Sequence, residues 1–166
     1  DWDLSPDACE MVLDVVRQHI PHVVLDLPHA WTGWIRRLLQ SADEIVITAA
    51  PDIANLRNAK NMVDLLKTAR NNDGPPHLVI NMHNTPKRPE IPIKEFAQAL
   101  DLTPIAVIEF DAETFGEAAN HGRMIEELNA KAKAVQPIRD IALTLTKRPL
   151  PKAEKKSPLA PLLEKL

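Results

Sequence analysis

The stretch HVVLDLP, residues 22–28, decides how the rest of the chain is interpreted. An apolar, β-branched run without a polar break is typical of a strand buried on both faces of a parallel sheet. The run ends in an acidic residue and a proline, and ligands of open α/β sheets bind at the carboxyl ends of the strands. Asp26 is therefore predicted to lie where a carboxylate can meet a metal ion or a phosphate-bound water. The alternative is an aspartate that only begins a turn before Pro28.

Further apolar segments follow the same pattern and are separated by helical patterns. The expected strands are 22–28, 44–49, 77–82 and 104–110, and the expected helices are 6–20, 31–42, 51–71, 95–100, 114–120 and 135–146. The alternation of strands and helices predicts an α/β fold with a partly or wholly parallel β-sheet flanked by helices. Asp26, Asn81 and Asp111 follow three of these strands, so we expect them at one edge of the sheet.

The composition limits the class of protein. A chain of 166 residues is long enough for one domain with a real core, and its net charge of −3 argues against a nucleic-acid partner. The single cysteine, Cys9, excludes an internal disulfide and favours a cytoplasmic location. No apolar run reaches the length of roughly 18 residues that a membrane span needs.

The basic, Pro-containing segment 148–166 is expected to be a flexible tail outside a domain formed by residues 1–147. Leu159–Leu166 carries leucines beside lysines. It is interpreted either as a helix that makes a peripheral membrane or partner contact or as a frayed terminus.

Several chemistries lack their motifs. No Cys/His pair has zinc spacing, and His22 and His29 would lie roughly 20 Å apart at the two ends of one strand. The sequence contains no G-x-S-x-G elbow, no G-x-G-x-x-G and no G-x-x-x-x-G-K-[ST]. These 166 residues therefore hold no phosphate-cradling loop.

Five segments carry a family resemblance. They are VVLDLP (23–28), ADEIVITAAPDIANLRNAKNMVDLL (42–66), HLVINM (77–82), KRPEIP (87–92) and FDAETFGEAANHGRMI (110–125). Together they resemble the carboxyl-terminal half of CpaE/TadZ proteins, which are MinD/ParA-like P-loop proteins that place and assemble type IVb (Flp/Tad) pili in bacteria. The resemblance implies that residues 1–147 are the carboxyl-terminal part of a Rossmann-type, three-layer P-loop NTPase domain that lacks the P-loop strand.

The same resemblance implies roles for four residues. Asp26 matches the catalytic Walker B aspartate, which holds Mg²⁺ through water beside the γ-phosphate. Asn81 matches the asparagine that recognises adenine, Asp111 matches the loop over the base, and Pro28 is the further nucleotide-contacting position. The implied cofactors are ATP and Mg²⁺ in the complete protein, with none bound to this chain alone.

Two departures from the family pattern bear on activity. Ala30 stands where the family usually has a glycine that lets the backbone approach the γ-phosphate. The family's P-loop lysine would lie upstream of Asp1, so we expect this chain to be catalytically inactive alone. The P-loop strand would also lie between 23–27 and 45–49, which predicts that these two segments are not directly paired, and open strand edges favour a homodimer.

Two functions remain open at this point. The first is a nucleotide-dependent switch whose dimerisation localises a pilus secretion machine, with the type II/IV pilus secretion ATPase and other Flp/Tad components as partners. It would act in the bacterial cytoplasm, at the cell pole on the inner face of the membrane. The alternative is a non-catalytic scaffold that docks the same machinery. A third hypothesis is a flavodoxin-like or receiver-like domain. Such a domain needs an acidic cluster or a phosphate loop, and the sequence shows neither.

Overall fold

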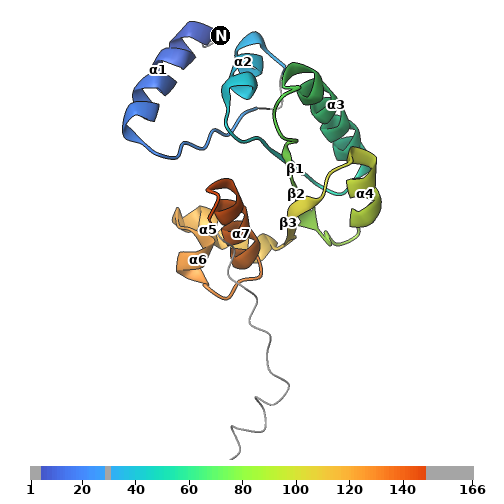
Figure 1. The fold of residues 1–166 in the computed structure, drawn as a ribbon. Helices are drawn as coiled ribbons and strands as arrows, with labels where there is room; N and C mark the ends of the chain where they lie inside the picture. Colours follow the sequence, from blue (N-terminus) through green and yellow to red (C-terminus); the bar gives the residue numbers. More distant parts are fainter. Residues whose placement is uncertain (1–4, 29–30, 149–166) are drawn as a thin grey trace, which may run out of the picture.

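The structure, a computed structural model, describes residues 5–28 and 31–148 (Figure 1). The predictions for Ala30, His29 and the leucine-containing tail Leu159–Leu166 fall outside these described residues. Within the part of the chain that is described, no helix is long and apolar enough to cross a membrane.

Three parallel strands form one sheet in the order β1-β2-β3, which confirms the predicted α/β class. The strands are β1 (Val46–Ala49), β2 (His77–His83) and β3 (Pro104–Glu109). The helices are α1 (Pro6–His19), α2 (Gly33–Ser41), α3 (Ile53–Ala69), α4 (Ile93–Leu100), α5 (Ala112–His121), α6 (Ile125–Leu128) and α7 (Val135–Leu145). Of these elements, only the short α6 had no counterpart among the predicted segments.

The helix boundaries follow the capping residues that the sequence offers. Ser5 Oγ accepts a hydrogen bond of 3.2 Å from the N–H of Ala8 at the start of α1. Asp52 Oδ1 accepts one of 2.8 Å from the N–H of Asn55 at the start of α3. Both helices therefore begin where a polar side chain satisfies a free backbone donor.

Side chains that alternate along β2 enter two different cores. Leu78 and Ile80 pack with Val63 of α3 and Phe96 of α4, and each of these four side chains is fully buried. Val79 points to the opposite face, where it packs with Ala134 and Ile108 and is joined by Ile125 and Ile141. Figure 1 shows α3 and α4 on one side of the sheet and α5 to α7 on the other. The sheet is thus the middle layer of three, as predicted.

The pairing of β2 with β3 contains two register shifts. Leu78 lies opposite Pro104 and Val79 opposite Ala106, so β3 has one extra residue there. Ile80 lies opposite Val107 and His83 opposite Glu109, so β2 has one extra residue between these pairs. The second shift is a bulge at Asn81 and Met82, and Met82 has a φ of 57°.

The prediction of a strand at 22–28 is wrong. In the structure this segment is irregular and exposed, and Val24 is 90% accessible to solvent. Among the described residues it pairs with no strand, and β1 pairs with β2 alone. The physical reason is that backbone N–H and C=O groups in an extended segment need a neighbouring strand, and in residues 5–28 and 31–148 none lies beside this one.

The elements before β1 are only partly packed. Arg37 of α2 forms exposed ion pairs with Asp7 at 3.3 Å and Glu10 at 3.8 Å on α1. Met11, Val12 and Val15 of α1 remain exposed, although their spacing gives the helix an apolar face. Trp31 is also exposed, with the Arg36 guanidinium 5.9 Å from its ring centroid.

Candidate functional site

The carboxyl ends of the three strands carry the polar side chains that can face a ligand. β1 leads into Pro51 and Asp52, β2 carries Asn81 two residues before its last residue, and β3 leads into Phe110 and Asp111. The N–H of Phe110 donates to the carbonyl oxygen of His83 at 2.7 Å, which holds the ends of β2 and β3 together. Asn81 and Asp111 therefore lie at one edge of the sheet.

Asn81 sits inside the bulge of β2. Its Oδ1 accepts a hydrogen bond of 2.8 Å from the N–H of Met82, the next residue in the chain. A bulge redirects a side chain relative to the regular pleat. Asn81 is half-buried and Met82 is exposed at this edge of the sheet.

Glu90 holds together the loop that follows β2. Its carboxylate accepts hydrogen bonds from the N–H groups of Asn84 and Thr85, both at 3.0 Å. It also contacts His83 Nδ1 at 2.9 Å and Arg88 Nη2 at 3.1 Å. Burial alone would raise the pKa of Glu90, but these donors lower it from 4.5 to about 2. The carboxylate is therefore charged throughout the physiological range.

The same loop is tied to β1. The N–H of Ile91 donates to the carbonyl oxygen of Pro51 at 2.8 Å, directly after the β1 strand. Positive charge on Arg88 also contributes to the lowered pKa of Asp52, after the larger effect of hydrogen bonds from Asn55. The loop thus spans the carboxyl edge from β1 to β3.

Asp111 acts locally as a helix cap. Its Oδ1 accepts a hydrogen bond of 3.0 Å from the N–H of Thr114 at the start of α5. Hydrogen bonding from Thr114 lowers the pKa of Asp111, and the charge of Lys133 contributes to a smaller extent. Lys133 forms its own ion pair with Glu109 at 2.8 Å. The arrangement brings a cation and two carboxylates to the end of β3.

The structure does not bring Asp26 and Pro28 to this edge. Both are exposed on the irregular segment that follows α1. Within residues 5–28 and 31–148 no group of three or more Asp, Glu, His or Cys side chains is arranged to hold a metal ion. Of the four predicted site residues, Asn81 and Asp111 therefore lie together at this edge, and Asp26 and Pro28 lie on the separate segment 22–28.

Sequence reasoning missed Glu90 and Arg88 as the centre of this edge. Both lie in the segment KRPEIP, which was noticed only as part of the family resemblance. The Glu90 carboxylate is held by hydrogen bonds from its own loop. Because the backbone of such a loop is irregular, the sequence carries no periodic pattern that would predict these hydrogen bonds. The available signal was the pair of prolines, Pro89 and Pro92, which restrict the loop backbone on both sides of Glu90.

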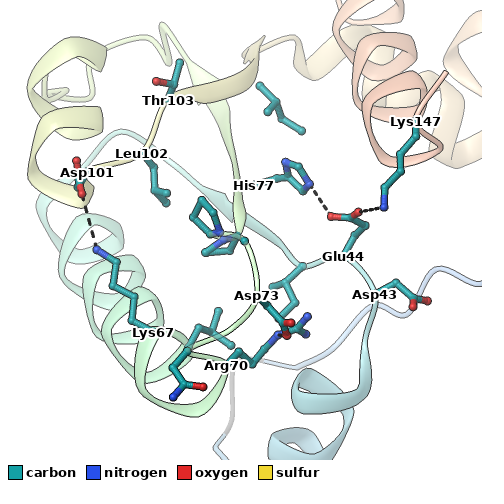
Figure 2. Close-up of a pocket in the computed structure, with 17 residues that line it drawn as sticks. Asp43, Glu44, Lys67, Arg70, Asp73, His77, Asp101, Leu102, Thr103 and Lys147 are labelled. Carbon is teal, nitrogen blue, oxygen red and sulfur yellow. Dashed lines mark hydrogen bonds and ion pairs between the residues drawn. The ribbon is translucent and has the colours of Figure 1, made fainter. Parts of the chain in front are cut away.

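A hollow of about 800 Å³ lies at the opposite, amino-terminal end of the strands. Figure 2 shows Glu44 between His77 and Lys147, with contacts of 2.9 Å and 3.2 Å. Hydrogen bonding from His77 is the largest cause of the lowered pKa of Glu44. The carboxylates and cations of the hollow are largely paired with one another, as in the Lys67–Asp101 pair at 3.9 Å. This hollow is separate from the candidate edge at the carboxyl ends of the strands.

Comparisons with known proteins agree with this fold. The chain is 25% identical over 142 residues to the septum site-determining protein MinD of Bacillus subtilis (strain 168), with 84% of this chain and 52% of that protein covered. No family model matches the chain. Because the match covers 52% of the Bacillus subtilis protein, the chain spans about half the length of that curated relative.

Solved structures of a ParA family ATPase and of MinD have a similar fold. A ParA family ATPase from Chlorobium tepidum TLS superposes with a TM-score of 0.69 at 19% identity, covering 85% of this chain and 57% of that one. MinD complexed with Mg-ADP from Pyrococcus horikoshii OT3 gives a TM-score of 0.71 at 19% identity, covering 86% and 57%.

The chain thus has an α/β fold that matches the fold of MinD/ParA-like proteins. The sequence match supports homology to the MinD/ParA-like P-loop ATPase superfamily. These comparisons do not separate the CpaE/TadZ family from the rest of that superfamily.

Proposed function

We propose that this chain supplies the base-facing side and the Asp26 segment of a nucleotide-dependent localisation switch. The observation that carries the proposal is the carboxyl edge of a MinD/ParA-like sheet, where Asn81 and the Asp111 loop are joined through His83 and Phe110. A nucleoside triphosphate bound there would meet the Asn81 amide at its base. The capped loop at Asp111 would form the neighbouring wall.

The phosphate side of the site is proposed to come from a P-loop strand outside these 166 residues. Among the described residues, β1 has one unpaired edge, and the largely exposed apolar segment 23–27 is paired with no strand. A strand inserted between them would satisfy the backbone groups of both. It would also place Asp26 at a strand end, where its carboxylate can hold a Mg²⁺-bound water and Pro28 can approach the nucleotide.

The finer part of the proposal is assembly and polar placement of type IVb (Flp/Tad) pili. The resemblance of the segments 42–66 and 110–125 to CpaE/TadZ proteins supports it. In this proposal the complete protein forms a homodimer in the bacterial cytoplasm and binds the pilus secretion ATPase and other pilus components. Mg-ATP is the nucleotide expected in the complete protein.

Calorimetric titration with Mg-ATP tests the nucleotide site. The 166-residue chain is compared with the longer protein that includes a P-loop half-domain, and the longer protein is repeated with Asp26→Ala and with Asn81→Ala. We expect binding by the longer protein only, weakened by both substitutions. An affinity for Mg-ATP that neither substitution weakens would contradict the proposed roles of Asp26 and Asn81.

A second candidate is a scaffold that docks the pilus machinery without using nucleotide. The exposed apolar face of α1, with Met11, Val12 and Val15, favours a protein contact in this region. If the longer protein does not bind Mg-ATP but retains the pilus secretion ATPase in a pull-down, the scaffold is the function. Loss of retention in the triple variant Met11→Ser, Val12→Ser, Val15→Ser would then place the contact on α1.

A further inference from the structure

Arg70 joins the carboxyl-terminal ends of two helices. It is the residue directly after α3, and only 12% of its side chain is exposed. Its Nη1 donates hydrogen bonds to the carbonyl oxygens of Leu39, at 2.6 Å, and Ala42, at 2.7 Å, at the end of α2. Its Nε donates to the Asp73 carboxylate at 2.8 Å, and Figure 2 shows these two side chains together. One guanidinium therefore ties the end of α2 to the end of α3.

These contacts fit an arginine in particular. The end of a helix leaves carbonyl oxygens without partners, and a cation there also meets the negative end of the helix dipole. The Nη1 atom carries two hydrogens, one for each of the two carbonyl oxygens, while the Nε–H donates to Asp73. A lysine ammonium has no fixed fork of donors of this kind. The carboxyl-terminal end of α2 is therefore held in a defined place.

The amino-terminal end of α2 has no such anchor among the described residues. Thr32 precedes the helix, but its side chain caps no backbone N–H, and its Oγ1 is buried without a hydrogen-bond partner. Trp31 is exposed, and segment 22–28 is irregular. Ile35 and Leu38 are buried, but apolar packing is non-directional and does not fix a helix end as hydrogen bonds do. The two ends of α2 therefore differ in how firmly they are held.

Segment 22–28 leads into α2 at this less firmly held end. In the proposed function the segment brings Asp26 to the phosphate side of the nucleotide, so nucleotide binding acts on it directly. We infer that Arg70 is a positioning residue of the switch. It holds the carboxyl-terminal end of α2 and the entry to β1 in place, while the amino-terminal end of α2 moves with the Asp26 segment. The inference rests on the proposed function, because it takes Asp26 to lie near the phosphates.

Hydrogen exchange followed by mass spectrometry tests this inference in the complete protein that carries these residues together with its P-loop half. Exchange is measured without nucleotide and with Mg-ATP, in the wild type and in Arg70→Met, which keeps the apolar part of the side chain and removes its donors. Two regions are compared, residues 31–35 at the amino-terminal end of α2 and residues 38–43 at its carboxyl-terminal end. Calorimetry measures separately whether each protein binds Mg-ATP.

In the wild type we expect Mg-ATP to slow exchange at residues 31–35 by about fivefold or more and to change it at residues 38–43 by less than about twofold. In Arg70→Met, exchange at residues 38–43 without nucleotide is expected to rise by about 10- to 100-fold, because hydrogen bonds to a charged group are lost. Mg-ATP is then expected to change exchange at residues 38–43 by about threefold or more, since that end of α2 is no longer held. Arg70→Lys is expected to restore part of the protection.

Two results would overturn the inference and leave the proposed nucleotide switch intact. One is a wild type that binds Mg-ATP but shows no change at residues 31–35, or an equal change at both ends of α2. The other is an Arg70→Met protein whose exchange at residues 38–43 rises by the same factor with and without Mg-ATP, which is the result that a purely structural contact gives. Failure of the wild type to bind Mg-ATP would overturn the proposed function and this inference with it.

Two further variants complete the test. Asp73→Asn keeps the donors of Arg70 and weakens the contact that orients them, so it is expected to raise exchange at residues 38–43 by about 3- to 10-fold and to make it sensitive to Mg-ATP. It decides the question in the same way if Arg70→Met does not fold. Arg123→Met is the matched control, because Arg123 is exposed and lies between α5 and α6 on the other side of the sheet. It is expected to leave exchange in α2 unchanged.

Discussion

Two short segments of this chain are both rich in apolar residues, but only one of them forms a strand. HLVINM, at 77–82, forms the central strand of the sheet, with Leu78, Val79 and Ile80 at most 2% exposed. HVVLDLP, at 22–28, is irregular, and Val24 is 90% exposed. The central strand has a neighbour on each edge, whereas no strand lies beside the earlier segment among the described residues. An apolar β-branched run therefore specifies a strand only where a partner strand is present.

The largest expected effect is a direct test of this difference. Each segment contains a leucine, and the exposed fractions of Leu78 and Leu25 are 0% and 45%. Leu78→Ala is expected to lower the free energy of unfolding by about 3–5 kcal/mol, because it leaves a cavity between the sheet and α3. Leu25→Ala is expected to change it by less than about 1 kcal/mol. Urea denaturation followed by circular dichroism measures both.

Equal losses in the two leucine variants would show that segment 22–28 is packed in solution. The same two substitutions are also compared in the proposed longer protein, which adds a P-loop strand. There Leu25→Ala is expected to approach the cost of Leu78→Ala, since both segments would then be central strands.

The second prediction concerns the loop that closes the carboxyl end of β2. Glu90→Gln removes the charge that binds Arg88 and His83 and weakens two backbone contacts. We expect a loss of about 3 kcal/mol, because the Arg88 guanidinium stays partly buried without a full partner. Hydrogen exchange at the amides of Asn84 and Thr85 is expected to accelerate. Unchanged exchange there would contradict the central role of Glu90.

Acid titration gives a related and slightly smaller effect. The pKa of Glu90 is lowered from 4.5 to about 2 on folding. Its stabilising contribution is therefore complete above the unfolded value and is lost as the pH falls toward the folded value. Between about pH 5 and pH 3 the wild type should lose about 2 kcal/mol more than Glu90→Gln. Parallel curves for the two proteins would contradict the assignment of this loss to Glu90.

The smallest expected effects come from the two helix caps. Asp52→Ala removes the acceptor for the N–H of Asn55 at the start of α3, whose inner face lies in the core. It is expected to cost about 1 kcal/mol of global stability. Ser5→Ala removes a similar cap from α1, which packs mainly against α2. We expect it to increase amide exchange within α1 while leaving the global unfolding midpoint unchanged.

Local chemistry explains how far the sequence predicts this fold. The strands at 46–49, 77–83 and 104–109 and the helix starts at Ser5 and Asp52 follow from apolar runs and capping residues. The placement of Asn81 and Asp111 at one edge follows from parallel topology. Segment 22–28 was predicted incorrectly because periodicity reports what a backbone prefers and cannot report whether a neighbouring strand exists.

The candidate site was predictable only in part for a similar reason. Asn81 was identified, but the loop contacts that Arg88 and Glu90 make beside it were not. Those contacts arise from a loop whose positive φ values, at Met82, Asn84 and Lys87, have no simple sequence pattern. The site's chemistry therefore depends on irregular backbone that sequence periodicity does not describe.

The two register shifts between β2 and β3 carry a consequence for how such a sheet can change length over evolutionary time. One extra residue on β3, beside Pro104, is balanced by one extra residue on β2, at Asn81 and Met82. Deleting either residue alone would leave the strands out of step and turn the following side chains toward the wrong layer. Deleting both would restore an uninterrupted ladder and remove the bulge that displays Asn81. Relatives are therefore expected to gain or lose these two residues together, and those that have lost them are expected to present a different side chain at this edge of the sheet.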